Sequence, residues 1–472
     1  MAEAKMLKFT DRVQAYPSKR VADERARDFL EIARPYIVAK AEEQAARCSQ
    51  CGVPFCQVHC PLHNNIPDWL KLTAEGRLEE AYELSAATST MPEICGRICP
   101  QDRLCEGNCV IEKDFGSVTI GSVEKFITDT AWENGWVKPV RIIADRSGQS
   151  VGIIGAGPAG LTAAELLRTK GYTVHVYDRH DRAGGLLTYG IPGFKLEKPV
   201  VMRRVQRLLD AGIVFHQDFE VGRDASLAEL RARHDAILIA TGVYAARQVA
   251  VPGADSSNVM EALDYLTASN RAGFGDTVAA GFDASGKHVV VIGGGDTAMD
   301  CVRTAVRQGA ASVKCLYRRD RANMPGSVRE VGHAEEEGVE FVWLAAPAAI
   351  TGNSVTATRM RLGQPGPDGR RTPEAEPESD FTARADIVIK ALGFDPEPLP
   401  VLFGAPDLSV TRWGTLRIDG KTMMASIPGV FGAGDIGRGA SLVVWAVRDG
   451  RDVTAQLHQY LRANVEATAH AA

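Results

Sequence analysis

Three features that would indicate other classes of protein are missing from this sequence. Lys and Arg number 54 against 59 Asp and Glu, a formal net charge of -5, so no excess of positive charge favours a nucleic-acid partner. No run of about 18 apolar residues is present to cross a bilayer. The first residues, which include Lys5, Lys8 and Asp11, lack the apolar core of a secretory signal. We therefore expect a cytoplasmic protein without a membrane partner.

Cysteine is present, but its distribution is uneven. The chain has ten cysteines, of which eight lie between Cys48 and Cys109. Cys301 and Cys315 stand alone later in the chain and are best interpreted as small buried apolar residues. Disulfides are disfavoured in a cytoplasmic protein. Because 472 residues with 45% hydrophobic content leave room for about three packed domains, the cysteine-rich segment marks one of them.

The eight clustered cysteines form two groups of four. A zinc ribbon needs two close Cys pairs, and only Cys48 and Cys51 form one. Closely spaced thiolates followed by Cys-Pro are instead typical of bacterial ferredoxins, so iron-sulfur clusters are favoured over zinc. The groups read Cys48-x-x-Cys51-x-x-x-x-Cys56-x-x-x-Cys60-Pro61 and Cys95-x-x-x-Cys99-Pro100-x-x-x-x-Cys105-x-x-x-Cys109.

Ferredoxins also indicate how these ligands divide. When two clusters lie together, the cysteine before proline ligates the cluster of the other group. The fourth ligand of the second cluster is then either Cys95 or a non-cysteine side chain such as Glu124, and the spacing leaves both open. The first cluster is predicted to bind Cys48, Cys51, Cys56 and Cys109, and the second Cys60, Cys99 and Cys105.

A glycine-rich turn follows a short apolar run at Val151–Ile154 and precedes a segment with helical period. This order of strand, glycine turn and helix is what a dinucleotide pyrophosphate requires. The next expected strand, Tyr172–Tyr177, ends at an acid placed to accept a hydrogen bond from a ribose hydroxyl. A nucleotide site is therefore predicted at Gly155, Gly157, Pro158, Ala159, Gly160 and Asp178.

A second copy of the pattern begins with the expected strand Lys287–Ile292. The position of the third fingerprint glycine holds Ala298, which the pattern tolerates. The next strand, Ser312–Tyr317, ends at Arg318 and Arg319 instead of an acid. Because guanidinium groups pair with a 2′-phosphate, this site should prefer NADPH over NADH. Its predicted turn residues are Gly293, Gly294, Gly295, Asp296 and Thr297.

Two similar strand ends indicate how the nucleotide domains are joined. The expected strand Ala236–Ala240 leads into Thr241-Gly242, and the strand Asp386–Ala391 leads into Leu392-Gly393. This repetition suggests that the NADPH domain is inserted into the first nucleotide domain. The predicted division is a helical iron-sulfur domain over 1–145, the first nucleotide domain over 146–280 and 391–472, and the inserted NADPH domain over 281–390.

Composition predicts the remaining local structure. A helix interrupted at Pro35 is expected over Val21–Arg47, and another over Trp69–Leu84. Gly363–Ser379 is polar and proline-rich, which is typical of a surface loop. A final helix is expected over Ser441–Leu461.

Together these motifs resemble known families. Two nucleotide fingerprints with one domain inserted in the other, and Gly434-Asp435 before a final helix, resemble the pyridine nucleotide-disulfide oxidoreductase fold. The cysteine motifs resemble more closely the small (beta) subunit of NADPH-dependent glutamate synthase. The runs that carry this likeness are Arg47–Cys56, Cys60–Pro67, Gly96–Pro100 and Gly190–Pro192.

The resemblance implies an α/β protein with two Rossmann-like domains after an α-helical iron-sulfur domain, binding FAD, NADPH and two 4Fe-4S clusters. Asp435 would hydrogen-bond the ribityl or pyrophosphate region of FAD. Relatives such as dihydropyrimidine dehydrogenase use one non-cysteine cluster ligand, and the matching position is Glu124, which we prefer to Cys95. Further FAD contacts are expected at Gly185, Leu186, Thr241, Gly242 and Gly434.

The resemblance also implies a function. The chain would oxidise NADPH at FAD and pass electrons through the clusters to a glutamate synthase large (alpha) subunit in a hetero-oligomer, where L-glutamate is made from L-glutamine and 2-oxoglutarate. Hydride transfer needs no side-chain acid or base, and none is assigned. Two alternatives stay open: a related subunit that serves another acceptor, such as a pyrimidine reductase or a ferredoxin, and a non-catalytic redox sensor stabilised by zinc.

Overall fold

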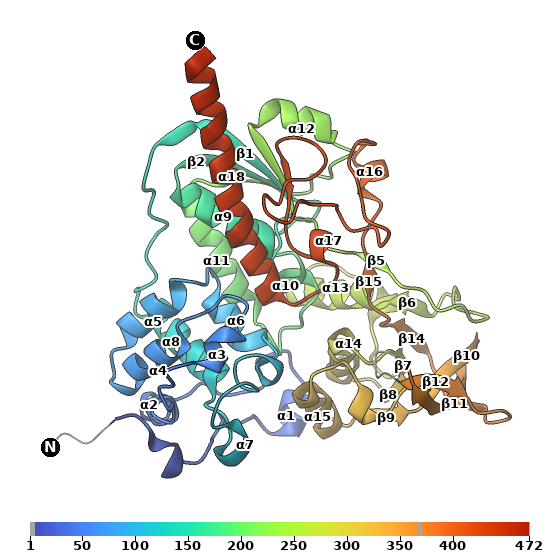
Figure 1. Ribbon diagram of the computed structural model, residues 1–472. Coiled ribbons are helices and arrows are strands. Elements are labelled where there is room, and N and C mark those ends of the chain that lie inside the picture. Colours follow the sequence, from blue (N-terminus) through green and yellow to red (C-terminus); the bar gives the residue numbers. More distant parts are fainter. Residues whose placement is uncertain (1–4, 367–370, 472) are drawn as a thin grey trace.

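The computed structural model describes residues 5–366 and 371–471, which form a helical N-terminal domain and two α/β units (Figure 1). The helical domain packs around the buried side chains of Trp69, Val123 and Ile127. Figure 1 shows its helices in blue, gathered at one end of the molecule. They are α2 (Val38–Ala45), α3 (Phe55–Val58), α4 (Ile66–Ala74), α5 (Leu78–Ala86), α6 (Pro92–Ile98), α7 (Glu112–Phe115) and α8 (Ile120–Glu133).

The helix expected over Val21–Arg47 is wrong for most of its length. Only α1 (Ala22–Arg25) and α2 are helical there. Residues 18–34 fold back on themselves, because the backbone N–H of Arg20 donates to Ile32 and that of Arg34 donates to Ser18, each at 2.9 Å. The expected helix over Trp69–Leu84 is divided into α4 and α5 at Gly76, whose positive φ of 76° ends α4.

The first α/β unit is a parallel sheet with strand order β16-β4-β1-β2-β3. One face packs against α9 (Pro158–Thr169), α11 (Lys198–Asp210) and α18 (Val443–Ala471). The other packs against α12 (Leu227–Arg233) and α16 (Leu399–Leu402). Coverage of both faces explains why the interior strand β4 is apolar and buried along its whole length. The strands are β1 (Arg146–Ile154), β2 (Tyr172–Tyr177), β3 (Val214–His216), β4 (Ala236–Ile239) and β16 (Val430–Gly432).

The second α/β unit is a parallel sheet of order β6-β14-β7-β8-β9, packed against α13 (Ala262–Gly273), α14 (Asp296–Arg307) and α15 (Val328–Glu336). The chain leaves the first sheet after β4 and returns to it at β16, which confirms the predicted insertion. β6 and α13 belong to this second unit although they precede residue 281. The strands are β6 (Val259–Glu261), β7 (His288–Ile292), β8 (Ser312–Tyr317), β9 (Glu340–Trp343) and β14 (Ile387–Lys390).

An antiparallel sheet extends from the second unit. It consists of β10 (Ala345–Thr351), β11 (Ser354–Pro365), β12 (Arg371–Ala375) and β13 (Phe381–Arg384). The surface loop predicted over Gly363–Ser379 is therefore wrong in part, since the end of β11 pairs with β12. This pairing uses backbone hydrogen bonds and leaves polar side chains exposed, so composition did not reveal it. Residues 367–370 of the predicted loop lie outside the described residues.

Short elements connect the two α/β units. β5 (Ala245–Ala246) pairs with β15 (Phe394–Asp395) where the chain crosses between the units in each direction. α10 (Leu186–Tyr189) and α17 (Asp435–Arg438) lie in the first unit, next to its glycine turn. Over the described ranges, no helix combines the length and apolar character needed to span a membrane.

Candidate functional site

The first predicted glycine turn joins β1 to α9. Gly155 has a φ of 109°, and a Cβ there would lie 2.3 Å from the carbonyl oxygen of Ala240, so only glycine fits. Gly157 differs, because a Cβ there would meet nothing within 4 Å. The turn therefore presents bare backbone to open space at the N-terminus of α9, the geometry that binds a pyrophosphate.

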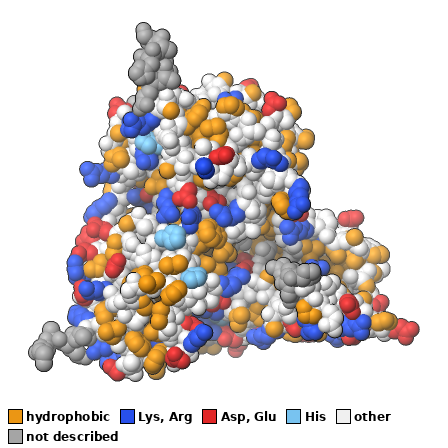
Figure 2. Space-filling view, in the orientation of Figure 1, with side chains coloured by type: hydrophobic (Ala, Val, Ile, Leu, Met, Phe, Trp, Pro, Cys, Tyr) orange, Lys and Arg blue, Asp and Glu red, His pale blue; other side chains and the backbone are white. Residues whose placement is uncertain are grey.

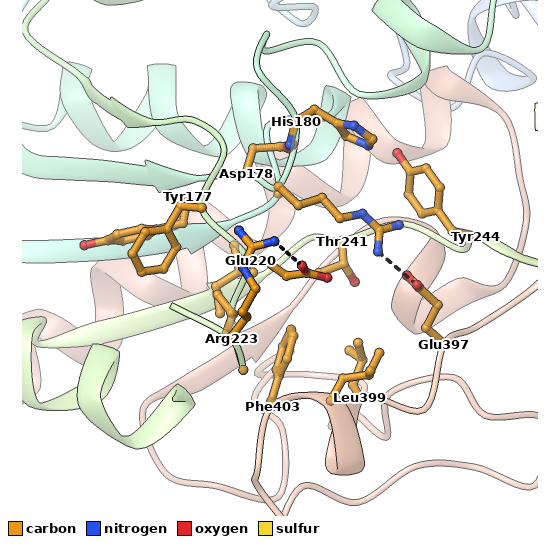
Figure 3. A pocket seen from close by; sticks show the side chains of 17 residues that line it. Tyr177, Asp178, His180, Glu220, Arg223, Thr241, Tyr244, Glu397, Leu399 and Phe403 are labelled. Atoms are coloured by element: carbon orange, nitrogen blue, oxygen red, sulfur yellow. Dashed lines mark hydrogen bonds and ion pairs between the residues drawn. The ribbon is translucent and has the colours of Figure 1, made fainter. Parts of the chain in front are cut away.

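A cavity of about 350 Å³ lies beside this turn. Figure 3 shows Asp178, Thr241 and Tyr244 around it, with Leu399 and Phe403 on another wall. The hydroxyl of Thr241 is buried and has no hydrogen-bond partner within the described chain. An unsatisfied buried hydroxyl fits a polar ligand, so the cavity suits the nucleotide part of a flavin cofactor.

Asp178 has a role that its sequence position did not indicate. Its Oδ2 accepts a hydrogen bond from the backbone N–H of Ala156 at 2.6 Å, and its Oδ1 accepts one from His180 at 2.8 Å. The carboxylate therefore holds the glycine turn as well as lining the cavity. Beside it, Arg179 pairs with Glu397 at 2.9 Å, and its guanidinium lies 4.5 Å from the ring centre of Tyr244.

The other predicted flavin contacts converge on the same turn. A Cβ on Gly185 would lie 2.9 Å from the Cα of Gly157, and one on Gly434 would lie 3.0 Å from the Cβ of Ala159. Leu186 begins α10, directly after Gly185, and Thr241-Gly242 lies at the end of β4. Burial raises the pKa of Asp435, at the start of α17, to about 6. These residues come from four separate segments, and their glycines allow close packing.

The second glycine turn repeats this geometry between β7 and α14. A Cβ on Gly293 would lie 2.2 Å from the carbonyl oxygen of Ala391, whereas Gly295 faces open space. Asp296 accepts a hydrogen bond from the backbone N–H of Ser327 at 2.8 Å, and Thr297 follows it in the first turn of α14.

Arg318 and Arg319 lie directly after β8, as predicted. Arg318 is exposed and Arg319 half-buried, and neither has an ion-pair partner within residues 5–366 and 371–471. The Nε of Arg319 is buried without a hydrogen-bond partner there. Guanidinium groups without internal partners at this strand end fit the 2′-phosphate of NADPH.

The structure brings together the predicted ligands of the first iron-sulfur cluster. One small hollow is lined by Cys48, Cys51, Cys56 and Cys109, together with Phe55 and Val110. The backbone and side-chain nitrogens of Gln50 donate to the sulfur of Cys48 at 3.5 and 3.3 Å. Donors of this kind stabilise thiolate ligands, so the set fits an iron-sulfur cluster.

The predicted second set also converges. Cys60, Cys99 and Cys105 are each close enough to Glu124 for its charge to raise their thiol pKa values, although burial or contact with Cys95 is the larger cause. Burial raises the pKa of Glu124 to about 8, and its Oε1 accepts hydrogen bonds from Ser85 at 3.1 Å and Asn64 at 3.4 Å. Cys95 lies against Cys99, so both candidates for the eighth ligand are within this set. In the described part of the chain, no three His, Cys, Asp or Glu side chains surround a single-ion site.

The two cysteine sets face different parts of the molecule. Cys60 and Cys99 of the second set pack against the core of the first α/β unit, and within the described residues no cysteine of the first set does. Cys60 also packs against the core of the helical domain, where Cys48, Cys56, Cys105 and Cys109 lie as well. The second set therefore lies on the side of the predicted flavin site, and the first lies farther out.

Two arginines of α18 hold the second set against the first unit. Arg448 donates to the carbonyl oxygen of Pro61 at 3.0 Å. Arg451 donates to those of Leu62 at 3.2 Å and Thr88 at 3.3 Å. Sequence reasoning missed these residues, because no local pattern links positions separated by more than 350 residues.

The comparisons with known proteins agree with this architecture. Residues 149–450 match the family of pyridine nucleotide-disulphide oxidoreductases, and residues 25–136 match dihydropyrimidine dehydrogenase domain II, 4Fe-4S cluster. Mycobacterium tuberculosis FprA in complex with NADPH has a similar fold, with a TM-score of 0.57 at 19% identity over 68% of this chain and 86% of that one. The fold and the cysteine sets thus define an oxidoreductase with an iron-sulfur domain.

Closer relatives give the particular family. The chain is 65% identical over 476 residues to the glutamate synthase [NADPH] small chain of Azospirillum brasilense, covering 99% of this chain and 98% of that one. It is 45% identical over 454 residues to the glutamate synthase [NADPH] small chain of Escherichia coli (strain K12), covering 94% and 96%. It belongs to the family of glutamate synthase small chains, which confirms the resemblance seen in the cysteine motifs.

Proposed function

We propose that this chain is the electron-input subunit of an NADPH-dependent glutamate synthase. It oxidises NADPH at FAD and delivers the electrons, through two 4Fe-4S clusters, to a large (alpha) subunit that makes L-glutamate from L-glutamine and 2-oxoglutarate. One observation supports this proposal most strongly. Cys60 and Cys99 pack against the core of the unit that contains the first glycine turn. Names of relatives as small chains support a hetero-oligomer with a large subunit.

The first unit supplies the flavin site. When bound, FAD accepts a hydride from NADPH, and the clusters carry single electrons. Gly157 and the N-terminus of α9 bind the pyrophosphate, because backbone N–H groups and the helix dipole favour an anion there. Asp435 hydrogen-bonds the ribityl or pyrophosphate region. The partial positive charge at the N-terminus of α18 would favour the reduced, anionic form of a flavin bound next to it.

The second unit supplies the NADPH site. Gly295 and the N-terminus of α14 bind the pyrophosphate, and Arg318 and Arg319 pair with the 2′-phosphate. We assign the inserted unit this role because its strand end carries two cations, where the first unit carries Asp178.

The helical domain supplies the cluster ligands. The first set is Cys48, Cys51, Cys56 and Cys109, and the second is Cys60, Cys99, Cys105 and Glu124. We expect Glu124→Ala to lower bound iron by about half and Cys95→Ser to leave it unchanged, because a [4Fe-4S] cluster needs four ligands. Iron analysis of anaerobically purified variants measures this. If Cys95→Ser lost one cluster and Glu124→Ala kept both, the assignment would be reversed.

The central experiment is anaerobic purification followed by analysis of iron, sulfide and FAD. NADPH-driven reduction of a dye then tests the input half, and glutamine-dependent glutamate formation with the large subunit tests the complete reaction. Absence of bound iron would overturn the proposal and favour a zinc-stabilised sensor. Dye reduction without glutamate formation would favour another acceptor, such as a pyrimidine reductase or a ferredoxin.

A further inference from the structure

An exposed apolar surface lies over the first cysteine set. Val53, Phe55, Val58 and Val110 expose 63%, 48%, 53% and 57% of their surface. Phe55 and Val110 also line the hollow of the first set, so this surface is the outer wall of that hollow. Phe55 and Val58 are three residues apart on the single turn of α3 and therefore lie on one face. We name these four residues the apolar collar.

The segment that carries three of the four collar residues is free of charge, whereas Val110 is followed by the exposed side chains of Glu112, Lys113 and Asp114. The segment 48–67, which carries four cysteines and three collar residues, contains no Asp, Glu, Lys or Arg. Figure 2 shows hydrophobic side chains gathered over the part of the helical domain that contains α3, with charged side chains toward its edges. Clusters of exposed apolar side chains bordered by polar residues mark protein interaction sites on soluble proteins.

The path of the electrons in the proposed function indicates what the apolar collar could bind. Cys60 and Cys99 of the second set pack against the first α/β unit, and Arg448 and Arg451 of α18 hold the loop after Cys60 there. The first set lies farther from that unit, and Phe55 and Val110 of the apolar collar line its hollow and are exposed. Electrons that enter from the first unit therefore reach the protein surface at the apolar collar.

We propose that the apolar collar is the docking surface for the acceptor subunit. This inference rests on the proposed function and adds the place and chemistry of the contact. The partner presents an apolar, uncharged surface and carries a one-electron acceptor behind it. Since no charged side chain lies within 48–67, desolvation of apolar surface drives the association, with little electrostatic steering. The affinity should consequently change little with salt concentration.

A charge placed on the apolar collar tests this proposal. Val58→Asp would bury an unpaired carboxylate in the contact and should weaken binding to the purified large subunit at least about ten-fold, whereas Val58→Ser should weaken it less. Val401→Asp on α16 is the matched control, because Val401 is 78% exposed and lies in the first α/β unit. Biolayer interferometry at low and high salt measures the affinity. Iron content and NADPH-driven dye reduction should stay at wild-type values in all three variants.

The outcomes separate this proposal from the proposed function. If the wild-type chain binds the large subunit and both Val58 variants bind as tightly as Val401→Asp, the docking surface is overturned and the proposed function stands. A large loss of wild-type affinity at high salt would also overturn the apolar contact. If sedimentation shows that Val58→Asp only separates a dimer of this chain, the apolar collar belongs to a second copy. Failure of the wild-type chain to bind the large subunit would overturn both proposals.

Discussion

A buried ion pair should determine how firmly the helical domain is held to the first α/β unit. Glu93 lies on α6, beside the second cysteine set, and Arg204 lies on α11. Arg204 donates to both carboxylate oxygens of Glu93, at 2.8 and 2.9 Å. Their side chains are only 0% and 3% exposed. Arg204→Met would leave the carboxylate buried without its cation, and the expected cost is about 3–5 kcal/mol of stability.

A double variant separates the net contribution of the ion pair to stability from the penalty of leaving one buried charge without its partner. In Glu93→Leu/Arg204→Met both charges are absent, so we expect most of the lost stability to return. Glu165, which lies 3.8 Å from Arg204, keeps its closer partner Arg207 at 2.6 Å. The double variant therefore leaves no new unpaired carboxylate.

Urea unfolding, followed by cluster absorbance and tryptophan fluorescence, measures these effects. Since a chain of several domains need not unfold in one step, the midpoint of the transition that releases iron is compared. Arg223→Met is the matched control, because its ion pair with Glu220 is exposed to solvent and should contribute little to stability. The reasoning fails if Arg204→Met is no less stable than this control. It also fails if the double variant loses as much stability as Glu93→Leu and Arg204→Met lose in sum.

Three further predictions concern the nucleotide domains. Gly157→Ala should leave the apoprotein stable, because the added Cβ meets open space. It should lower the FAD content of the purified protein, because the pyrophosphate could no longer approach the backbone. A FAD content equal to that of the wild type would count against a pyrophosphate at this position. Arg318→Gln/Arg319→Gln should lower the preference for NADPH over NADH, measured as the ratio of kcat/KM values, by about 10- to 100-fold, since charged hydrogen bonds contribute about 1.5–3 kcal/mol. Burial lowers the pKa of His234 to about 4, so its contribution to stability is complete above about pH 6.5 and is lost as the pH falls toward 4. The melting temperature of His234→Gln should therefore fall less than that of the wild type when the pH is lowered. An equal fall in both proteins would refute this.

The parts of the fold that local pattern determines could be predicted from the sequence. β2 and β8 have the predicted bounds, because each is mostly apolar and is followed directly by a charged residue. The turns after β1 and β7 were also predicted, since tight turns and bare backbone require glycine. The division of the cysteines into two spatial sets followed from the Cys-Pro rule of ferredoxins.

The features that sequence reasoning missed depend on distant partners. The helix expected over Val21–Arg47 is interrupted after α1, and this segment is held by distant ion pairs: Lys19 pairs with Glu336 at 2.6 Å and Arg25 with Glu337 at 3.1 Å, both more than 300 positions away. The pairing of Glu93 with Arg204 spans 111 positions. Helical propensity and periodicity contain no information about such contacts. The identity of the eighth cluster ligand is undetermined by spacing for the same reason, because Cys95 and Glu124 reach the same place from α6 and α8.

The long final helix affects how constant the distance between the first glycine turn and the second cysteine set can remain. α18 packs along α9, which begins at the first glycine turn. Arg448 and Arg451 of α18 also donate hydrogen bonds to the loop that follows Cys60. In the proposed function, this one helix therefore contacts both ends of the path that an electron would follow from the flavin to the second cysteine set. Thermal motion that tilts this helix would move both ends together, so we expect the distance between the proposed flavin site and the second cysteine set to stay nearly constant.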